Sequence, residues 1–464
     1  MELTTHPQSR PEQATGYSVL LAERVLALAD SLHLSQQWHS LQLGHPSRRR
    51  TAYPNEHRIA ALLAGLATGL PGIAPGNFWL RSNSALQARL AGRFPDQGTI
   101  HRWLAQATTE QAAALRSHLH RVVAEHGRFW HEMTAPELLV IDIDGQGLVA
   151  RGQRFERART GYLGEGLDRG FQRYVCYAAA TAEVLDELLL PGNTTLMSAL
   201  PPLLQGLDEV LPRRCRKRVL LRADSHAGTA ANLACMRQHG YHYLCPLYSC
   251  WSKKKLRKRL LGKRPFCFVA VDSDGQERHI RCWQLRRWRL VSKDGKARVR
   301  PRAMAYCQVD DEGEEHWQIL LTDVKGRSPA WWWRRYQERG GTIEEYNDQT
   351  ERAYHLEVMR TGNYAGLQAM HSLVAVCWNL TRWATEGLLL PPMLSPQAAE
   401  VSWVRAESLA LSQLVERASH SGLRLYRRGV GEPLEVEDTV DSAESRAWIG
   451  CLQQPVQLRL RLTG

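Results

Sequence analysis

The stretch that decides the fold is Leu138-Leu139-Val140-Ile141-Asp142-Ile143-Asp144-Gly145, an apolar run that carries two acids. A short apolar run that ends at a glycine predicts a buried strand. Asp142 and Asp144 are two residues apart, so their side chains point to the same face of that strand. We expect Asp144 at the end of the strand, before a glycine turn, where a metal ion can reach it. We expect Asp142 deeper in the strand.

A second acid closes a second apolar run. Asp224 ends the predicted strand Arg218-Val219-Leu220-Leu221-Arg222-Ala223-Asp224, and a helix is expected to open directly after it. An acid at the end of an apolar strand is costly unless it binds a metal or is hydrogen-bonded. Two functions therefore stay open for each strand-end acid. It is either a metal ligand, or a cap for the turn or helix that follows.

A third acid lies in the segment Tyr336-Gln337-Glu338-Arg339-Gly340-Gly341-Thr342-Ile343-Glu344-Glu345-Tyr346. Glu344 follows an apolar residue in the first turn of a predicted helix. An ordinary acidic, exposed helix face is the alternative. What favours a functional site is the order of the acids, with two strand-end aspartates followed by a glutamate on a helix. Carboxylates that converge in this way suit hard divalent cations.

The order of elements around the acids predicts an α/β protein with an RNase H-like catalytic core. Three strands, at 138–145, 173–182 and 184–190, precede a helix at 196–211, a strand, a helix at 227–239 and a strand at 241–247. We divide the chain into an N-terminal helical domain that binds DNA (1–130), the first part of the core (131–247), a β-rich basic insertion (248–325), the helical remainder of the core with Glu344 (326–425) and a C-terminal tail (426–464) with a strand at 456–462.

The N-terminal domain is predicted from helical spacing of apolar residues at 17–41, 57–69, 84–92 and 98–123. Prolines and glycines from Pro71 to Gly76 are expected to break the chain. Asp96 or Thr99 is the expected cap of the last helix. A turn and helix at this point suit docking on DNA, and an ordinary helical bundle is an equal alternative.

Composition narrows the class of protein. The chain has 464 residues, 44% of them hydrophobic and 23% charged, which is typical of a folded globular protein. Its formal net charge of +13 favours polyanionic partners. Ten scattered cysteines without a CxxC pair argue against zinc ribbons. The absence of a long apolar run argues against a membrane helix, so we expect a cytoplasmic protein without a membrane partner.

A basic run follows the predicted core strands. It includes Lys253, Lys254, Lys255 and Arg257, with tryptophans such as Trp283 further along the insertion. Basic side chains with interleaved aromatic rings suit the backbone and displaced bases of DNA. A solvated basic face is the alternative.

These motifs resemble those of the insertion-sequence DDE transposases, the bacterial cut-and-paste group with a Tyr–Arg–Glu–Lys signature. The resemblance spans residues 55–425 and rests on VIDIDGQ, VLLRADSHAGT and YQERGGTIEEY. It implies that Asp144, Asp224 and Glu344 are the catalytic acids and bind Mg²⁺ or Mn²⁺, with Asp142 and Glu345 as supporting or alternate acids. It also implies that Tyr336 and Arg339 contact the backbone of the transposon end.

The signature is altered in two places. Glu344 lies five residues beyond Arg339, where the family has four, and the extra residue falls in the Gly340-Gly341 pair, where a local bulge or loop would absorb it. The expected lysine, seven residues beyond the glutamate, is Glu351. Arg352 or Arg360 is a candidate replacement for its charge.

The expected partners are the terminal inverted repeats and the target DNA, bound by a homodimer at the bacterial nucleoid. A metal-dependent nuclease and a non-catalytic DNA-binding protein derived from a transposase are the rival functions.

Overall fold

The structure, a computed structural model, describes residues 4–5, 18–41, 53–133, 137–164, 166–248, 250–260, 263–271, 277–285, 288–309, 313–390, 404–405, 411–419, 421, 423–426, 434–438 and 442–453. These residues form two compact units. Unit 1 comprises Met1–Val122, Leu148–Ala158 and Asn347–Gly464, and unit 2 comprises Val123–Gly147 and Arg159–Tyr346. The strand expected at 456–462 lies outside the described residues. The five-part division of the chain stays a prediction.

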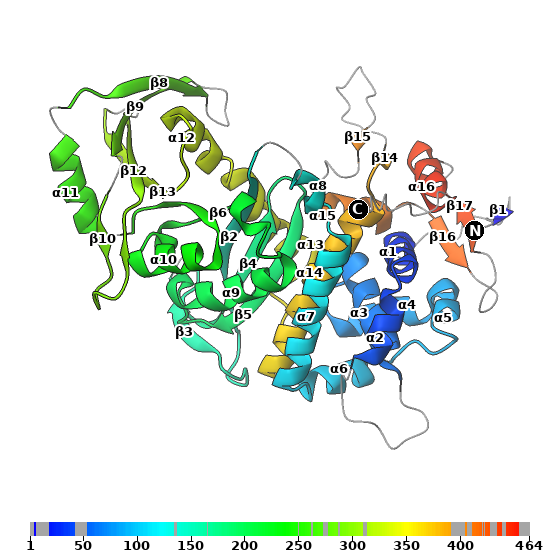
Figure 1. The fold of residues 1–464 in the computed structure, drawn as a ribbon. Coiled ribbons are helices and arrows are strands. Elements are labelled where there is room, and N and C mark those ends of the chain that lie inside the picture. The colour runs from blue at the N-terminus through cyan, green and yellow to red at the C-terminus, as the bar shows by residue number, and fades with distance from the viewer. Residues whose placement is uncertain are drawn as a thin grey trace. The chain divides into compact units, whose positions relative to one another are not determined.

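Unit 2 is built on one mixed sheet, to which the described residues contribute ten strands (Figure 1). They are β2 (Leu139–Val149), β3 (Arg159–Tyr162), β4 (Leu167–Ala178), β5 (Glu183–Pro191), β6 (Val219–Ala223), β7 (His242–Pro246), β8 (Phe266–Val271), β9 (Glu277–Leu285), β12 (Arg302–Val309) and β13 (Glu315–Thr322). Their order is β3-β4-β2-β6-β7-β13-β12-β9-β8, and β5 also pairs with β4. The strands expected in the insertion therefore extend the core sheet.

The centre of this sheet is parallel. β2 pairs with β6, and β6 pairs with β7, both in parallel orientation. Leu139 to Ile143 are all buried, as expected for a strand covered on both faces, and this explains their nearly continuous apolar sequence. The strands β13, β12, β9 and β8 follow β7 in antiparallel pairs.

One expectation about β2 is wrong. Gly145 does not form a turn, because β2 continues through it to Val149. The parallel pairing with β6 nevertheless stops at the pair Ile143 and Ala223. Asp144 is thus the first residue of β2 beyond the part that pairs with β6.

Helices cover the sheet of unit 2, where Figure 1 shows α9 and α10 beside the strands. The helices of this unit are α8 (Phe129–Glu132), α9 (Leu196–Val210), α10 (Ala230–His239), α11 (Cys250–Leu260) and α12 (Pro329–Gln337). Ser328 caps α12 by accepting a hydrogen bond from the backbone N–H of Trp331. Trp332 of α12 is buried in a core cluster with residues of β2, β6, β7, β9, β12 and β13. This packing fixes α12 on the sheet directly before the segment that carries Glu344.

Unit 1 is mostly helical, and its described residues also form two small sheets. Its helices are α1 (Leu20–Ser31), α2 (Leu34–Ser40), α3 (Asn55–Ala67), α4 (Ile73–Arg81), α5 (Ser84–Arg89), α6 (Gln97–Ala105), α7 (Thr109–His126, which ends in unit 2), α14 (Tyr364–Ala384), α15 (Leu411–Ser419) and α16 (Ala443–Gln453). Its strands are β1 (Thr4–Thr5), β16 (Leu423–Tyr426) and β17 (Glu435–Asp438) in one sheet, and β14 (Leu389–Leu390) with β15 (Val404–Arg405) in another. The core lies where α1 and α3 pack on α14, which is buried along nearly its whole length.

The predicted helices of unit 1 are present with three differences. The helix expected at 17–41 is interrupted at His33, whose φ of 58° is left-handed, and that expected at 98–123 is divided into α6 and α7. The break expected at 71–76 is shorter than predicted, because Pro71 and Gly72 lie between α3 and α4 but α4 begins at Ile73. Pro75 is tolerated there because the first turn of a helix needs no N–H from it. Asp96 caps α6, as predicted. Among the described helices, none is both long and apolar enough to cross a bilayer.

A buried histidine links two helices of unit 1. Trp38 of α2 donates a hydrogen bond to Nε2 of His118 on α7 over 2.9 Å. His118 is fully buried. Burial, together with the nearby charge of Arg121, lowers the pKa of His118 to about 4. The imidazole is therefore neutral in the folded protein at neutral pH.

The stability of the protein should fall between pH 6.5 and pH 4 because of His118. In this window the unfolded chain binds a proton that the folded chain does not, which costs about 1.4 kcal/mol per pH unit. Urea unfolding at pH 7.5 and pH 5 should show a loss about 2 kcal/mol larger in the wild type than in His118→Gln. The exposed His101 of α6 provides the control His101→Gln, which should behave like the wild type. Equal losses in all three proteins would contradict the assignment.

Candidate active site

Asp144 and Asp224 follow the last registered pair of two neighbouring parallel strands. Ile143 pairs with Ala223, so Asp144 is the next residue of β2 and Asp224 is the residue directly after β6. The two carboxylates are near enough to affect one another. Burial raises the pKa of Asp144, and the negative charge of Asp224 raises it further, while Arg339 opposes both effects. The sheet thus brings the first two predicted acids together.

Arg339 joins the first predicted acid to the third. Its Nη2 forms an ion pair with Oδ1 of Asp144 at 2.5 Å, and its Nη1 donates to Oε1 of Glu344 at 3.1 Å. Arg339 is 7% exposed, whereas the side chain of Glu344 is 58% exposed. One guanidinium therefore stands between two carboxylates that the sequence assigned to a metal.

The extra residue between Arg339 and Glu344 is accommodated at a kink between two helices. A π-helical turn at Gly340–Glu344, called η3, connects α12 with α13 (Glu345–Tyr354). Gly341 departs from helical geometry within it, with φ −86° and ψ 15°. α12 ends at Gln337, and Glu338 and Arg339 form a turn before η3 begins, so the extra residue lies at the junction of two helices. Glu344 therefore pairs with Arg339 although it lies five residues away.

Asp142 belongs to a buried network of hydrogen bonds next to the acids. Both of its oxygens accept hydrogen bonds from Arg222, at 2.5 and 2.7 Å, and the two residues are cross-strand partners of β2 and β6. Thr342 donates to Oδ2 of Asp142 at 2.5 Å. Arg222 also donates to the backbone carbonyl of Arg335. The pair therefore connects the sheet to both ends of the segment that leads to Glu344.

Asp224 has a neighbour that the sequence analysis did not assign. Oδ2 of Asp224 lies 2.8 Å from Nδ1 of His226. Oδ1 accepts the backbone N–H of His226 at 2.9 Å, which caps the 3₁₀ turn η2 (Ser225–Ala227). Asp224 therefore acts as a cap, one of the two roles considered for it from the sequence. The side chain of Asp224 is still 35% exposed. His226 lies within the quoted motif, so its spacing to Asp224 was available as a signal.

Tyr174 of β4 and Tyr336 of α12 flank the acids. Burial raises the pKa of both phenols, and the charges of Asp224 and Asp144 raise them further. A Cβ at Gly145 would come within 2.6 Å of the ring of Tyr174, so this position needs a glycine. No sequence signal could assign Tyr174 to the site, because its place depends on how β4 pairs in the sheet.

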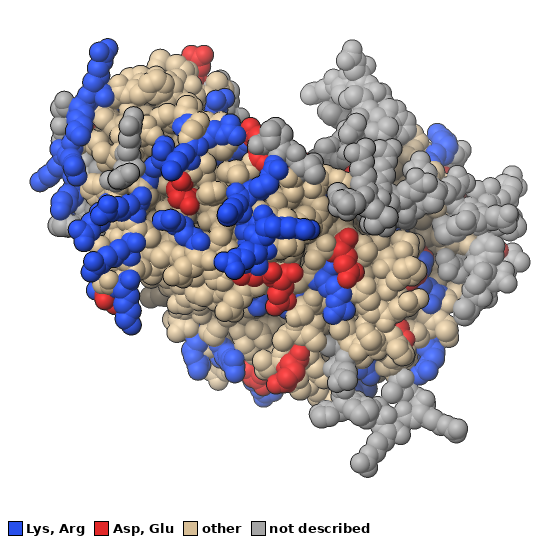
Figure 2. Space-filling model, viewed as in Figure 1, with Lys and Arg blue, Asp and Glu red and all other residues tan. Residues whose placement is uncertain are grey.

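The predicted basic contacts lie on α11 of unit 2. Lys254, Lys255 and Arg257 are exposed, and Lys253 is in the same helix, although its side chain is outside the described residues. Figure 2 shows Lys and Arg gathered over this part of the unit, with few acids. Arg257 pairs with Glu315 at 2.6 Å and lies over the ring of Trp317. Trp317 stacks on Trp283, with ring centroids 5.0 Å apart.

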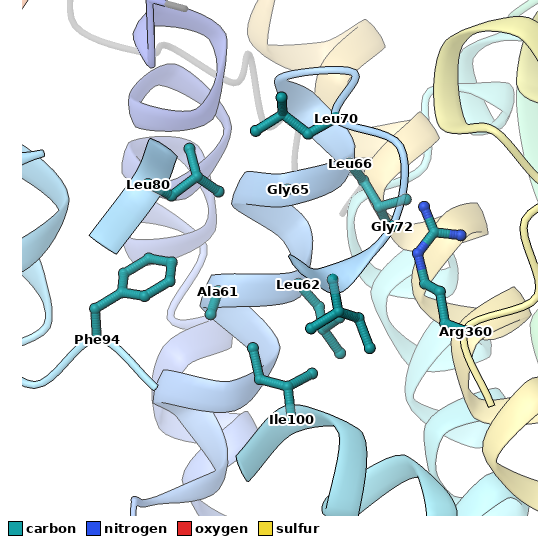
Figure 3. A pocket seen from close by; sticks show the side chains of 11 residues that line it. Ala61, Leu62, Gly65, Leu66, Leu70, Gly72, Leu80, Phe94, Ile100 and Arg360 are labelled. Atoms are coloured by element: carbon teal, nitrogen blue, oxygen red, sulfur yellow. The ribbon is translucent and has the colours of Figure 1, made fainter. Parts of the chain in front are cut away.

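The two candidates for the missing lysine are held differently within unit 1. Arg352 is exposed and pairs with Asp348, one helical turn earlier, at 2.9 Å. Arg360 donates to the carbonyl of Tyr354 at 2.9 Å and lines an otherwise apolar pocket beside α3 (Figure 3). Desolvation lowers the pKa of Arg360 to about 10, which leaves it charged at neutral pH. Glu345 is exposed at the start of α13.

The acids fit a divalent cation in chemistry but are not yet gathered around one. Two carboxylates from adjacent strands offer the hard oxygen ligands that Mg²⁺ and Mn²⁺ prefer. Within the described part of the chain, no group of three His, Cys, Asp or Glu side chains is close enough to hold a metal ion. Glu344 pairs with Arg339 instead of lying beside the two aspartates.

Comparison with known proteins identifies the class to which this fold and site belong. The family model of the transposase DDE domain matches residues 135–380, which include all three acids. The chain belongs to this family. No curated protein matches it. Among solved structures it is similar to piggyBac transposase, in the cryo-EM structure of its synaptic complex with hairpin DNA. The identity is 13%, over 96% of this chain and 83% of that one. The TM-score is 0.40.

The substitution Asp142→Asn should destabilise the protein by about 3–5 kcal/mol, because it leaves the buried charge of Arg222 with only the half-exposed Glu338, 3.5 Å away, as an ion-pair partner. Urea unfolding measures this loss. The same substitution at Asp348, in the exposed pair with Arg352, should cost less than about 1 kcal/mol. Equal effects at the two positions would show that the buried pair does not hold the site together.

Deletion of Gly341 should be tolerated. It removes the residue whose backbone departs from helical geometry and restores a spacing of four between Arg339 and Glu344, so the unfolding free energy should change by less than about 1 kcal/mol. Deletion of Ala375 from the buried helix α14 should cost more than about 3 kcal/mol, because one residue rotates the rest of a helix by about 100°. Circular dichroism and urea unfolding of both variants test the difference, and a Gly341 deletion as damaging as that of Ala375 would refute it.

Proposed function

We propose that this protein is a DDE transposase that cuts DNA at the ends of an insertion sequence and joins the ends to target DNA. The observation that carries the proposal is the placement of Asp144 and Asp224. They lie next to each other at the end of the β2–β6 pairing, within the region that the family model matches. Glu344 is the third acid, reached through Arg339.

The strand order supports an RNase H-like core in unit 2. Strands β5, β4 and β2 are followed across the sheet by β6 and β7, and α9 and α10 lie between the later strands in sequence. Apart from the short β3, which was not predicted, this is the order of three strands, helix, strand, helix and strand on which the fold class was predicted. On this proposal β8, β9, β12 and β13 belong to the insertion, which enlarges the sheet on the far side of β7.

Asp144, Asp224 and Glu344 are the residues that would hold Mg²⁺ or Mn²⁺. When bound, the metal supplies activation of water or a 3′-hydroxyl and stabilisation of the leaving oxygen. The role of the protein is to hold the two aspartates in place at the ends of rigid strands and to position the glutamate next to them. Asp142 supports this arrangement through Arg222 and Thr342. Glu345 remains the alternate to Glu344.

The DNA partner is proposed from charge and from the family. Tyr336 and Arg339 are placed beside the acids and would contact the backbone of the transposon end. The exposed side chains of α11 would contact DNA over a wider area, because counterion release favours the binding of such basic surfaces. Arg352 or Arg360 would supply the charge of the missing lysine. Residues 1–130 would dock on DNA, and two copies would act together.

Cleavage and joining of a duplex that carries the repeats flanking the gene test this function. With Mg²⁺ the full-length wild type should yield joined products, and Asp224→Asn should reduce them by at least about 10³-fold, because a lost ligand removes metal-assisted chemistry. Asp168→Asn changes an exposed acid of β4 and should leave the yield unchanged. Cuts without joining would support a nuclease instead. Binding of the duplex without any metal-dependent cutting would support a non-catalytic DNA-binding protein.

A further inference from the structure

We propose that Arg339 is a latch on the metal site, which holds Asp144 and Glu344 in the free protein and exchanges them for a phosphate of bound DNA. The inference rests on the proposed function and deepens it. It makes completion of the metal site depend on the arrival of DNA. Arg339 thereby acts as a positioning residue for the acids and as a contact to DNA, in two successive states.

The first argument is occupancy. The guanidinium contacts Oδ1 of Asp144 and Oε1 of Glu344, at 2.5 and 3.1 Å. These oxygens are the donors that a divalent cation would need. A guanidinium and a metal ion repel one another at such short range, and more strongly where little water screens them. Arg339 must therefore leave at least one carboxylate before a cation binds both.

The second argument concerns what holds the latch closed. Among the described residues, Glu344 has Arg339 as its one ion-pair partner, and its side chain is more than half exposed. Asp144 lies deeper and carries the shorter contact. The two ends of the bridge stand on opposite sides of the departure from helical geometry at Gly341. Glu344 can therefore separate from Arg339 by moving its own exposed side chain, while Thr342 stays bonded to Asp142.

The third argument is that Arg339 has capacity for another anion. It is almost fully buried, yet its Nε has no hydrogen-bond partner among the described residues. A phosphate oxygen is the anion that a guanidinium binds through two parallel N–H groups. A DNA phosphate at this position would occupy the free Nε and release the carboxylates. Because coupling between two ligands is reciprocal, DNA would then favour the metal, and the metal would favour DNA.

Titration of Mn²⁺ into the full-length protein without DNA, followed by the EPR signal of free Mn²⁺, tests the latch. Arg339→Gln should bind Mn²⁺ at least about tenfold more tightly than the wild type, within the range of such couplings. Arg335→Gln removes an arginine of α12, four residues before Arg339, that pairs with Glu137 and Glu338, and should match the wild type. Arg339→Lys keeps the charge but has a single ammonium group in place of the forked guanidinium. Its affinity for Mn²⁺ should be about threefold higher than that of the wild type.

The same variants are then tested for DNA in EDTA, by fluorescence anisotropy with a labelled 40-base-pair duplex from the flank of the gene. Arg339→Gln should bind this duplex about tenfold more weakly, although it binds Mn²⁺ more tightly. Opposite effects of one substitution are the signature of the latch. A merely structural Arg339 would weaken both.

Three results would overturn the proposal. The first is unchanged or weaker Mn²⁺ binding by Arg339→Gln. The second is wild-type Mn²⁺ binding by Arg339→Lys, which would leave charge alone as the cause. The third is unchanged duplex binding by Arg339→Gln. If Arg339→Gln does not fold, Arg339→Lys carries the same test. A protein that joins DNA ends but shows no gain in Mn²⁺ affinity keeps its proposed function and loses the latch. A protein that shows the gain but never cuts DNA loses the proposed function.

Discussion

The charged pair of Asp142 and Arg222 is the constraint on which the rest of the site depends. It lies between β2 and β6 with almost no exposure, and each partner would carry a large desolvation cost without the other. Because the pair is bidentate and in register, it fixes the two strands relative to each other. Asp144 and Asp224 inherit their proximity from that register. The third acid depends on it as well, because Thr342 and the carbonyl of Arg335 bind the same two side chains.

Two aspartates two residues apart on one strand therefore have different environments. Asp142 is neutralised by a permanent cation and lies in the interior, so its charge serves the fold. Burial raises the pKa of Asp144, and a second carboxylate nearby raises it further, while the arginine that opposes both effects also pairs with Glu344. A buried ion pair adds little net stability compared with an apolar pair, but it is costly to break in half. The ion pair therefore favours the one register of the two strands in which both partners meet.

Much of this could be predicted from the sequence. The apolar runs with terminal acids predicted β2 and β6, and their order predicted which acids would meet, because parallel neighbours end at the same edge. The contacts across the sheet could not be predicted. Tyr174 reaches the acids only because β4 lies next to β2, and spacing along the chain carries no information on that pairing. Gly145 was expected in a turn because glycine often ends a strand, yet here it makes room for the ring of Tyr174. The link between Arg339 and the acids was also missed, since Arg339 was assigned to DNA alone.

The π-turn between Arg339 and Glu344 has a consequence for how relatives of this chain are recognised. Intervals counted along a sequence stand for distances only while the helix type stays constant. Here one inserted residue changes the interval and leaves the facing pair intact. A search pattern with rigid gaps would pass over this protein, whereas an alignment by spatial position would recover it. Among relatives with such a turn, conservation should be sought in the pairing of the two side chains. The number of residues between them in the sequence can differ by one.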